Sequence, residues 1–379
     1  MTDTTKLMLD KSMFWVTDVS LFQKERQEAS RGYFTLVQNP TKTELRSGLY
    51  KPRLTLTKRF NASGRHERTL SVEFSAPKLL YGNNFDEVQD SDFVRITELL
   101  SSVLKTMGVR IFNHVLLSAP VSAIHYSKNI PLTDGSTPHY LISKIKEANI
   151  PLALDVNQTD YRNDGHSYKW HSNSYEVAFY DKIKDLEMAK KSDKRAIEKD
   201  NAIQLNILDA LEQRKRLEVL RMEVRLNNRQ KMKQLFKTLK IDKELTFQSL
   251  FSSNISQQVL LHYIDELERQ RPKLLDYGVS NPKALLADLI INNPRLGVKR
   301  TIQLFGLKNA FDAFTPRELR AMFGKYNNRS WYRLFAEAKQ VKLPITKSPF
   351  DIVRKNLITF EPLKLVAIQD QMLNNVKYD

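Results

Sequence analysis

Tyr180 and Lys182 lie two positions apart in the segment EVAFYDK, residues 176–182, which places a phenol near an ammonium group. A tyrosine hydroxyl can attack a phosphodiester, and phenolate is a good leaving group when that reaction runs in reverse. Because the pKa of free tyrosine is about 10, a neighbouring cation must favour its ionised form at neutral pH. We therefore predict Tyr180 as a nucleophile and Lys182 as its electrostatic partner.

A metal site and phosphate contacts would complete such a reaction. Glu73, His125 and Glu223 offer two carboxylates and an imidazole, which suit Mg²⁺ or Mn²⁺. A divalent ion there would polarise the phosphate under attack. Arg221 and Arg225 stand two positions on either side of Glu223, where they can contact the same phosphate. This set of residues predicts transesterification of a phosphodiester.

Four short segments must hold these side chains, and each has apolar residues at every second position, as strands do. They are residues 70–76 (LSVEFSA), 121–128 (VSAIHYSK), 176–182 (EVAFYDK) and 218–227 (EVLRMEVRLN). Alternation puts the candidate residues on the polar side of each strand, so one sheet face should gather them. The plainer alternative is an ordinary solvated face, since antiparallel sheets commonly expose charged residues on one side.

The rest of the chain has mostly helical periodicity. Residues 185–217 contain no Gly or Pro and many helix formers, and from residue 229 onward apolar residues recur at helical spacing. We predict an α+β fold, in which an antiparallel sheet has helices on one face and a mainly helical C-terminal region follows. The expected domains are a catalytic domain over 1–230, a helical connector over 231–280 and a helical DNA-binding domain over 281–379.

The chain is strongly basic. Its 379 residues include 60 Lys and Arg against 43 Asp and Glu, a formal net charge of +17, and residues 281–379 alone hold 17 against 8. Such a field attracts polyanions, with nucleic acid first among them. The absence of Cys excludes disulfides and thiolate metal sites. With neither a signal peptide nor 18 consecutive apolar residues, we expect a cytoplasmic protein without a membrane partner.

Residues 315–341 predict two helices joined by a turn. Thr315 is placed as an N-cap, with Pro316 at the first helical position and Glu318 three residues after the cap. The second helix carries three cations that would contact DNA if the pair is a helix-turn-helix: Arg329, Arg333 and Lys339. A plain helical hairpin with solvated basic residues is the alternative.

The sequence resembles the phage and plasmid replication initiators of the II/X family. The matching segments, in order, are VEFSAPKLLYGNN at 72–84, VSAIHYSKNI at 121–130, KWHSNSYEVAFYDKIKDLE at 169–187 and RMEVRLNNR at 221–229. The residue types that match the family's pattern are Glu73, Asn84, Tyr180, Lys182, Glu223 and Arg225. His125 departs from relatives that have an acidic residue on that strand. The closely spaced His pair of the broader nickase class is also missing, because His166 and His171 are five residues apart.

The resemblance implies a rolling-circle initiator in a bacterial host cell. Such a protein nicks one strand of origin DNA, duplex or single-stranded, through a 5′-phosphotyrosine link with Mg²⁺ or Mn²⁺, and later rejoins the strand. Recruitment of a host helicase stays open. The alternatives are a non-catalytic origin-binding protein or repressor, and a packaging protein, which fits the Glu, His, Tyr and Arg array poorly.

Overall fold

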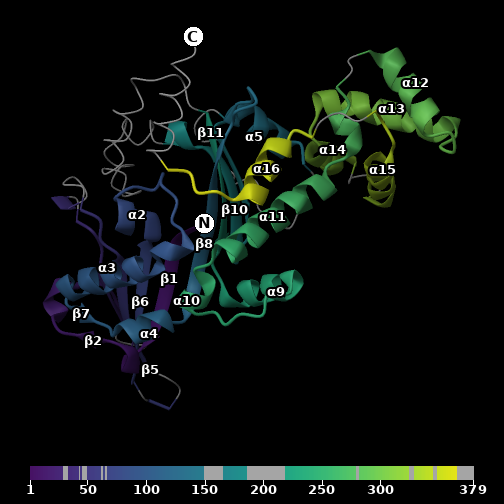
Figure 1. Ribbon diagram of the computed structural model, residues 1–379. Helices are drawn as coiled ribbons and strands as arrows, with labels where there is room; N and C mark the ends of the chain where they lie inside the picture. The colour runs from purple at the N-terminus through teal and green to yellow at the C-terminus, as the bar shows by residue number, and fades with distance from the viewer. Residues whose placement is uncertain are drawn as a thin grey trace, which may run out of the picture.

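The computed structural model describes residues 1–364 except 29–32, 42, 45–48, 61–62, 65, 149–164, 186–217, 279–280, 324–327 and 345–347. One large sheet occupies the N-terminal part, and the described residues from 229 onward fold into helices (Figure 1). The mixed fold with a large antiparallel sheet is thus confirmed. Nearly all of the helix predicted over 185–217 lies outside the described residues.

The sheet has nine strands in the order β3-β4-β5-β6-β1-β8-β11-β10-β9, and every neighbouring pair is antiparallel. The four predicted strand segments are confirmed as β6, β8, β10 and β11. The strands span β1 Thr2–Asp10, β3 Gln23–Glu28, β4 Tyr33–Gln38, β5 Arg53–Phe60, β6 His66–Ser75, β8 Val121–Pro131, β9 Ser167–His171, β10 Tyr175–Asp181 and β11 Val219–Leu226. A small separate sheet pairs β2 (Trp15–Val16) with β7 (Val109–Arg110).

Helices cover the sheet and then build the C-terminal region. They are α2 Ala76–Tyr81, α3 Phe93–Thr106, α4 Asn113–Leu117, α5 Pro138–Lys146, α9 Arg229–Leu239, α10 Phe247–Leu250, α11 Ser253–Gln270, α12 Pro282–Asn292, α13 Val298–Ala313, α14 Pro316–Phe323, α15 Asn328–Gln340 and α16 Asp351–Thr359. None of the described helices is both long and apolar enough to cross a membrane.

The two faces of the sheet differ in chemistry because apolar and polar residues alternate along its strands. Val72, Phe179 and Met222 are buried and belong to one hydrophobic cluster with Leu100 of α3 and Ile264 of α11. Helices α9, α11 and α16 contact β8, and α5 contacts β9 and β10. The opposite face is polar and lines a groove, so the fold separates a structural face from a chemical one.

A second hydrophobic cluster holds the C-terminal helices together. It runs from Leu274 to Val341, whereas Phe350, Val353 and Leu357 return to the first cluster through α16. Arg354 of α16 pairs with Asp265 of α11 at 2.6 Å, which fastens this return. Figure 1 shows α16 lying beside α11, with α12 to α15 forming a separate group. The domain boundaries at 230 and 280 stay a prediction. The described residues of the second cluster form an insertion between α11 and α16, which pack against each other.

Helices α14 and α15 follow the predicted local pattern. The backbone N–H of Thr315 donates to the Glu318 carboxylate at 2.8 Å, and the backbone N–H of Glu318 donates to the Thr315 hydroxyl at 3.3 Å, so the two residues form a capping box and α14 begins at Pro316. The turn residues 324–327 lie outside the described part of the chain. The two helices exist, but a helix-turn-helix arrangement of them remains a prediction.

Candidate functional site

A groove of about 490 Å³ lies on the polar face of the sheet. Its lining includes five of the predicted catalytic, metal-binding or DNA-binding residues, which are Glu73, His125, Tyr180, Glu223 and Arg225. They come from four strands, β6, β8, β10 and β11, that are spread over more than 150 residues of sequence. The groove thus brings these five side chains together, whereas the predicted Arg221 and Lys182 are not in its lining.

The strand register explains how the groups meet. Arg225 lies opposite Glu176 of β10 on one side and opposite His125 of β8 on the other. One step along the same face, Glu223 lies opposite Ala178 and Ser127. Side chains directly opposite in an antiparallel pair stand about 5 Å apart, which brings acids and bases within reach of one another. The register thus builds an alternating pattern of charge across three strands.

Glu223 is the centre of this pattern and is only 3% exposed. Arg225 donates to its two oxygens, from Nε at 2.9 Å and from Nη2 at 3.2 Å, and Nδ1 of His125 lies 3.5 Å from Oε1. Burial alone would raise the pKa of Glu223, but Arg225 and His125 hold that pKa well below its usual range. Glu223 is therefore an ionised carboxylate at neutral pH.

Tyr180 points its hydroxyl at this carboxylate. The hydroxyl donates to Oε2 of Glu223 at 3.3 Å. Burial, followed by the negative charge of Glu223, raises the pKa of Tyr180 well above its usual value, although Arg221 opposes the shift. The phenol is thus protonated and oriented, with an ionised acceptor beside it.

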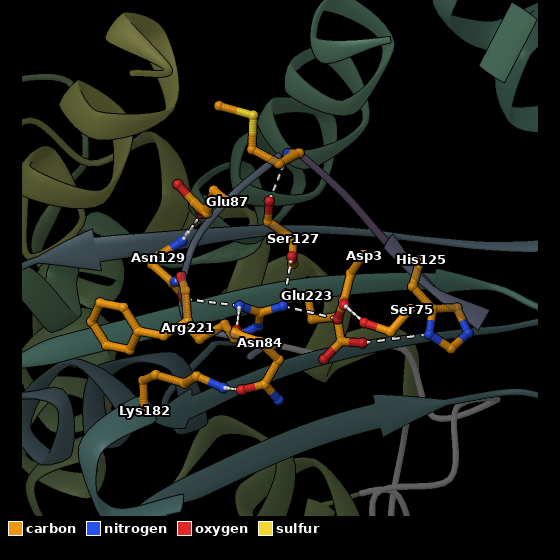
Figure 2. Close-up of polar contacts among 12 residues, drawn as sticks. Asp3, Ser75, Asn84, Glu87, His125, Ser127, Asn129, Lys182, Arg221 and Glu223 are labelled. Atoms are coloured by element: carbon orange, nitrogen blue, oxygen red, sulfur yellow. Dashed lines mark hydrogen bonds and ion pairs between the residues drawn. The ribbon is translucent and has the colours of Figure 1, made fainter. Parts of the chain in front are cut away.

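Lys182 does not continue the strand as its spacing suggested. β10 ends at Asp181, whose side chain accepts hydrogen bonds from the backbone N–H groups of residues 183 and 184 at 3.0 Å and so starts a helical turn. The Lys182 side chain is fully buried, and its ammonium donates to Oδ1 of Asn84 at 2.8 Å (Figure 2). Burial and the nearby Arg221 lower the pKa of Lys182 to about 7. Its Nζ lies 6.0 Å from the Tyr180 ring centre, so it remains a neighbour of the phenol.

Arg221 is buried rather than available at the surface, because its side chain is only 2% exposed. Its guanidinium donates to Asp3 at 2.8 Å and to Ser127 at 2.8 Å. Further bonds reach the Asn84 carbonyl at 3.1 Å and the Asn129 side chain at 3.0 Å (Figure 2). The structure therefore gives Arg221 a structural role in joining β1, β8 and β11, and leaves Arg225, whose side chain is 36% exposed, as the arginine that a phosphate can reach.

The three predicted metal ligands separate into a pair and a single residue. His125 and Glu223 adjoin, whereas Glu73 of β6 pairs with Lys6 of β1 at 3.5 Å. Three strand spacings separate β6 from β11, or about 14 Å at 4.8 Å each. Among the described residues, no group of three His, Asp or Glu side chains is close enough to hold a metal ion. A divalent ion would find one carboxylate and one imidazole here.

Other lining residues were missed at the sequence level. Glu176 accepts ion pairs from Arg225 at 2.9 Å and from Lys169 at 3.1 Å. Glu176 stands four positions before Tyr180 on the same strand, so period-two alternation places both on one face and could have revealed it. His166, which the sequence analysis named only for its distance from His171, also lines the groove, with Nδ1 3.4 Å from Asp181, and no spacing signal could have shown that pairing.

The predicted DNA contacts of the C-terminal region lie on α15. Arg329 and Arg333 are exposed. Lys339 is half-buried, with Nζ 5.2 Å from the ring centre of Phe335, and burial lowers its pKa. The two arginines are therefore better placed than Lys339 to contact a ligand.

Comparison with known proteins gives this chain no relative: no protein-family model, no curated protein and no solved structure matches it.

Proposed function

We propose that the chain is a replication initiator that nicks one DNA strand at an origin through Tyr180. The observation that carries the proposal is the hydrogen bond from the Tyr180 hydroxyl to the buried, ionised Glu223 in an open groove of a chain with a net charge of +17. An oriented hydroxyl beside a carboxylate is the arrangement that nucleophilic attack needs. The resemblance to the II/X initiators points to the same reaction.

The reaction transfers a phosphoryl group from DNA to the protein. Oη of Tyr180 bonds to the phosphorus, the bond from phosphorus to the O3′ atom breaks, and the released strand ends in a 3′ hydroxyl. Glu223 is placed to receive the phenolic proton, which ends on the O3′ atom. Arg225 supports the phosphate because it reaches the groove surface and already spans Glu223 and Glu176. Rejoining runs through the same atoms in reverse.

His125 and Glu223 would hold a Mg²⁺ or Mn²⁺ ion. Such an ion would polarise the phosphate. The raised pKa of Tyr180 makes a cation beside the phenol necessary, because the protonated phenol is a weak nucleophile. Glu73 lies too far along the sheet to share that ion through the contacts described above.

The test uses 3′-labelled single-stranded oligonucleotides that tile the replicon encoding the chain, with Mg²⁺, with Mn²⁺ or with a chelator. We expect one oligonucleotide to give an SDS-resistant protein adduct only with metal. Tyr180→Phe should abolish the adduct and leave DNA binding within a few-fold, because a single hydroxyl is removed. Tyr175→Phe is the matched control, since its ring stacks on Tyr263 at 5.6 Å. An undiminished adduct with Tyr180→Phe would assign the reaction to another tyrosine.

A non-catalytic origin-binding protein is the second candidate. The observation that favours it is the closed hydrogen bonding of the groove, in which the phenol is protonated and Arg225 neutralises Glu223. This candidate predicts tight origin binding with no adduct in any metal. The same gel assay therefore decides between the two functions.

A further inference from the structure

A second groove, of about 660 Å³, lies against α9 and outside the Tyr180 groove. Arg229, Lys233 and Lys237 follow each other at intervals of four residues along α9. At 3.6 residues per turn they fall within an arc of about 80°, next to the buried side of Met232, Leu235 and Phe236. The three cations form one stripe, which Lys240 and Lys243 extend beyond the helix end. These five residues are called the α9 stripe below.

The α9 stripe carries more positive charge than its surroundings neutralise. Two carboxylates, Asp242 and Glu244, line the same groove as the five cations. Lys233, Lys237, Lys240 and Lys243 are exposed, and within the described residues none of them is ion-paired. Arg229 donates from Nη1 to the carbonyl of Val121 at 2.9 Å, which fixes the start of the helix against β8. A positioned helix thus presents several cations to the solvent.

Lys240 adds an unusual backbone feature. It closes α9 in the left-handed region at φ 57°, a position that favours glycine. A side chain with a β-carbon is disfavoured there, so the lysine is kept at some cost in stability. Residues held in such conformations are often functional. Lys240 supplies an ammonium group at this position.

The α9 stripe follows directly after the strand that carries Arg225, although α9 itself packs on the helix-covered face of the sheet, opposite the Tyr180 groove. β11 ends at Leu226 and α9 begins at Arg229, so Arg229 lies only four positions after Arg225. Even a fully extended chain of that length spans at most about 14 Å.

The chemistry of the α9 stripe favours duplex over single-stranded DNA. Proteins that bind single strands combine cations with exposed aromatic rings on which bases stack. The aromatic residue in the described lining of this groove is Phe236, which is only 3% exposed. Cations without a stacking platform suit the phosphates of a duplex.

We propose that the α9 stripe binds the sugar-phosphate backbone of double-stranded DNA. The choice of DNA as the polyanion rests on the proposed function. The binding itself needs neither metal nor nicking.

The test measures binding of the full-length protein to a short duplex of arbitrary sequence over a range of salt concentrations in chelator. Lys233→Gln, Lys237→Gln and Lys240→Gln together should weaken binding about tenfold or more. They should also make the slope of log affinity against log salt shallower by about 3, since each phosphate contact contributes about 0.9. The matched control replaces Lys11, Lys24 and Lys105, three exposed lysines on other elements, by Gln and should leave the slope unchanged. Equal slopes for the two triple variants would overturn the proposal.

Lys240→Gly separates binding from folding. Glycine relieves the left-handed backbone, so this variant should have a higher thermal midpoint while its salt slope becomes shallower by about 1. A raised midpoint with an unchanged slope would remove Lys240 from the interface with DNA. If the triple variant bound single strands more weakly but bound the duplex as the parent does, the assignment to duplex DNA would be wrong.

The outcome is independent of the adduct experiment. A chain that binds duplex through the α9 stripe and forms no adduct would support this inference and contradict the proposed function. A chain that forms the adduct while the triple variant binds like its control would support the function and contradict this inference.

Discussion

Arg221 and Arg225 show how two residues of one type on one strand take different roles. Both lie on the same side of β11, as their spacing predicted, yet Arg221 is enclosed by Asp3, Ser127 and Asn129 while Arg225 reaches the groove surface. Alternation fixes the side of a strand but not the depth to which a neighbouring segment covers it. Removing one partner of a buried ion pair, such as that of Arg221 with Asp3, typically costs about 3–5 kcal/mol of folding free energy.

Lys182 gives a prediction about pH at the residue scale. The pKa of Lys182 is about 7 in the folded chain and 10.5 in the unfolded chain. Between these values the unfolded chain binds the extra proton, so the unfolding free energy should rise with pH by at most about 1.4 kcal/mol per unit. Urea unfolding from pH 7 to 9.5 should show the parent gaining stability relative to Lys182→Met.

The control for that series is Lys283→Met, which removes an exposed lysine at the start of α12. The difference between the parent and this control should not change with pH. A difference between the parent and Lys182→Met that is also independent of pH would mean that Lys182 stays charged in the folded protein.

At the scale of elements, period-two alternation predicted the four strands that carry the five predicted residues of the groove, but not β1, β5 and β9, which also line it. The limits of the prediction lie at the strand ends and between strands. Asp181 ends β10 by accepting backbone hydrogen bonds, which turns Lys182 away from its expected direction. Glu73 shares the polar face with Glu223, but the strand order separates them, and local periodicity contains no information on strand order. The carbonyl of Asn84 accepts a hydrogen bond from Arg221 of β11, a contact between residues far apart in the sequence that local periodicity cannot predict.

Helix α15 carries a prediction about duplex binding. Replacing the exposed Arg329 and Arg333 together by Ala should weaken binding of duplex origin DNA and spare cleavage of a short single strand. Removing one cation from a phosphate should make the salt slope shallower by about 0.9, which gives about 2 for the pair. A parallel decrease in single-strand cleavage would place α15 in the catalytic channel, and an unaltered slope would show that neither arginine touches the DNA backbone.

At the scale of the whole molecule, helices α12 to α15 form an insertion between α11 and α16, two helices that pack on the sheet. α11 and α16 pack together, and Gln257 of α11 donates to the carbonyl of Leu357 at 2.9 Å. The guanidinium carbon of Arg271 lies 5.9 Å from the ring centre of Phe350, so the two ends of the insertion are close. The charge count predicted a basic module over residues 281–379. It could not show that α16, within that range, packs back onto the first hydrophobic cluster.

This arrangement predicts that the insertion can be removed. Replacing residues 273–348 by a short Gly and Ser linker should leave cooperative unfolding and single-strand cleavage intact while reducing duplex affinity. Truncation after residue 272 should be more harmful, because it also removes α16 and the bond from the Leu363 N–H to Glu87 at 2.8 Å. Thermal unfolding of the two shortened chains compares them directly, and equal destabilisation of both would contradict the insertion.

The position of β8 in the sheet has a consequence for protein synthesis. β8 pairs with β1, which is made early, and with β11, which begins about 90 residues after β8 ends. At 5–20 residues per second the ribosome needs about 4–18 s to make the intervening chain. During that interval one edge of β8 lacks its strand partner, and unpaired edges invite misassembly. The His125 and Glu223 pair is therefore among the last parts of the sheet to assemble on a growing chain.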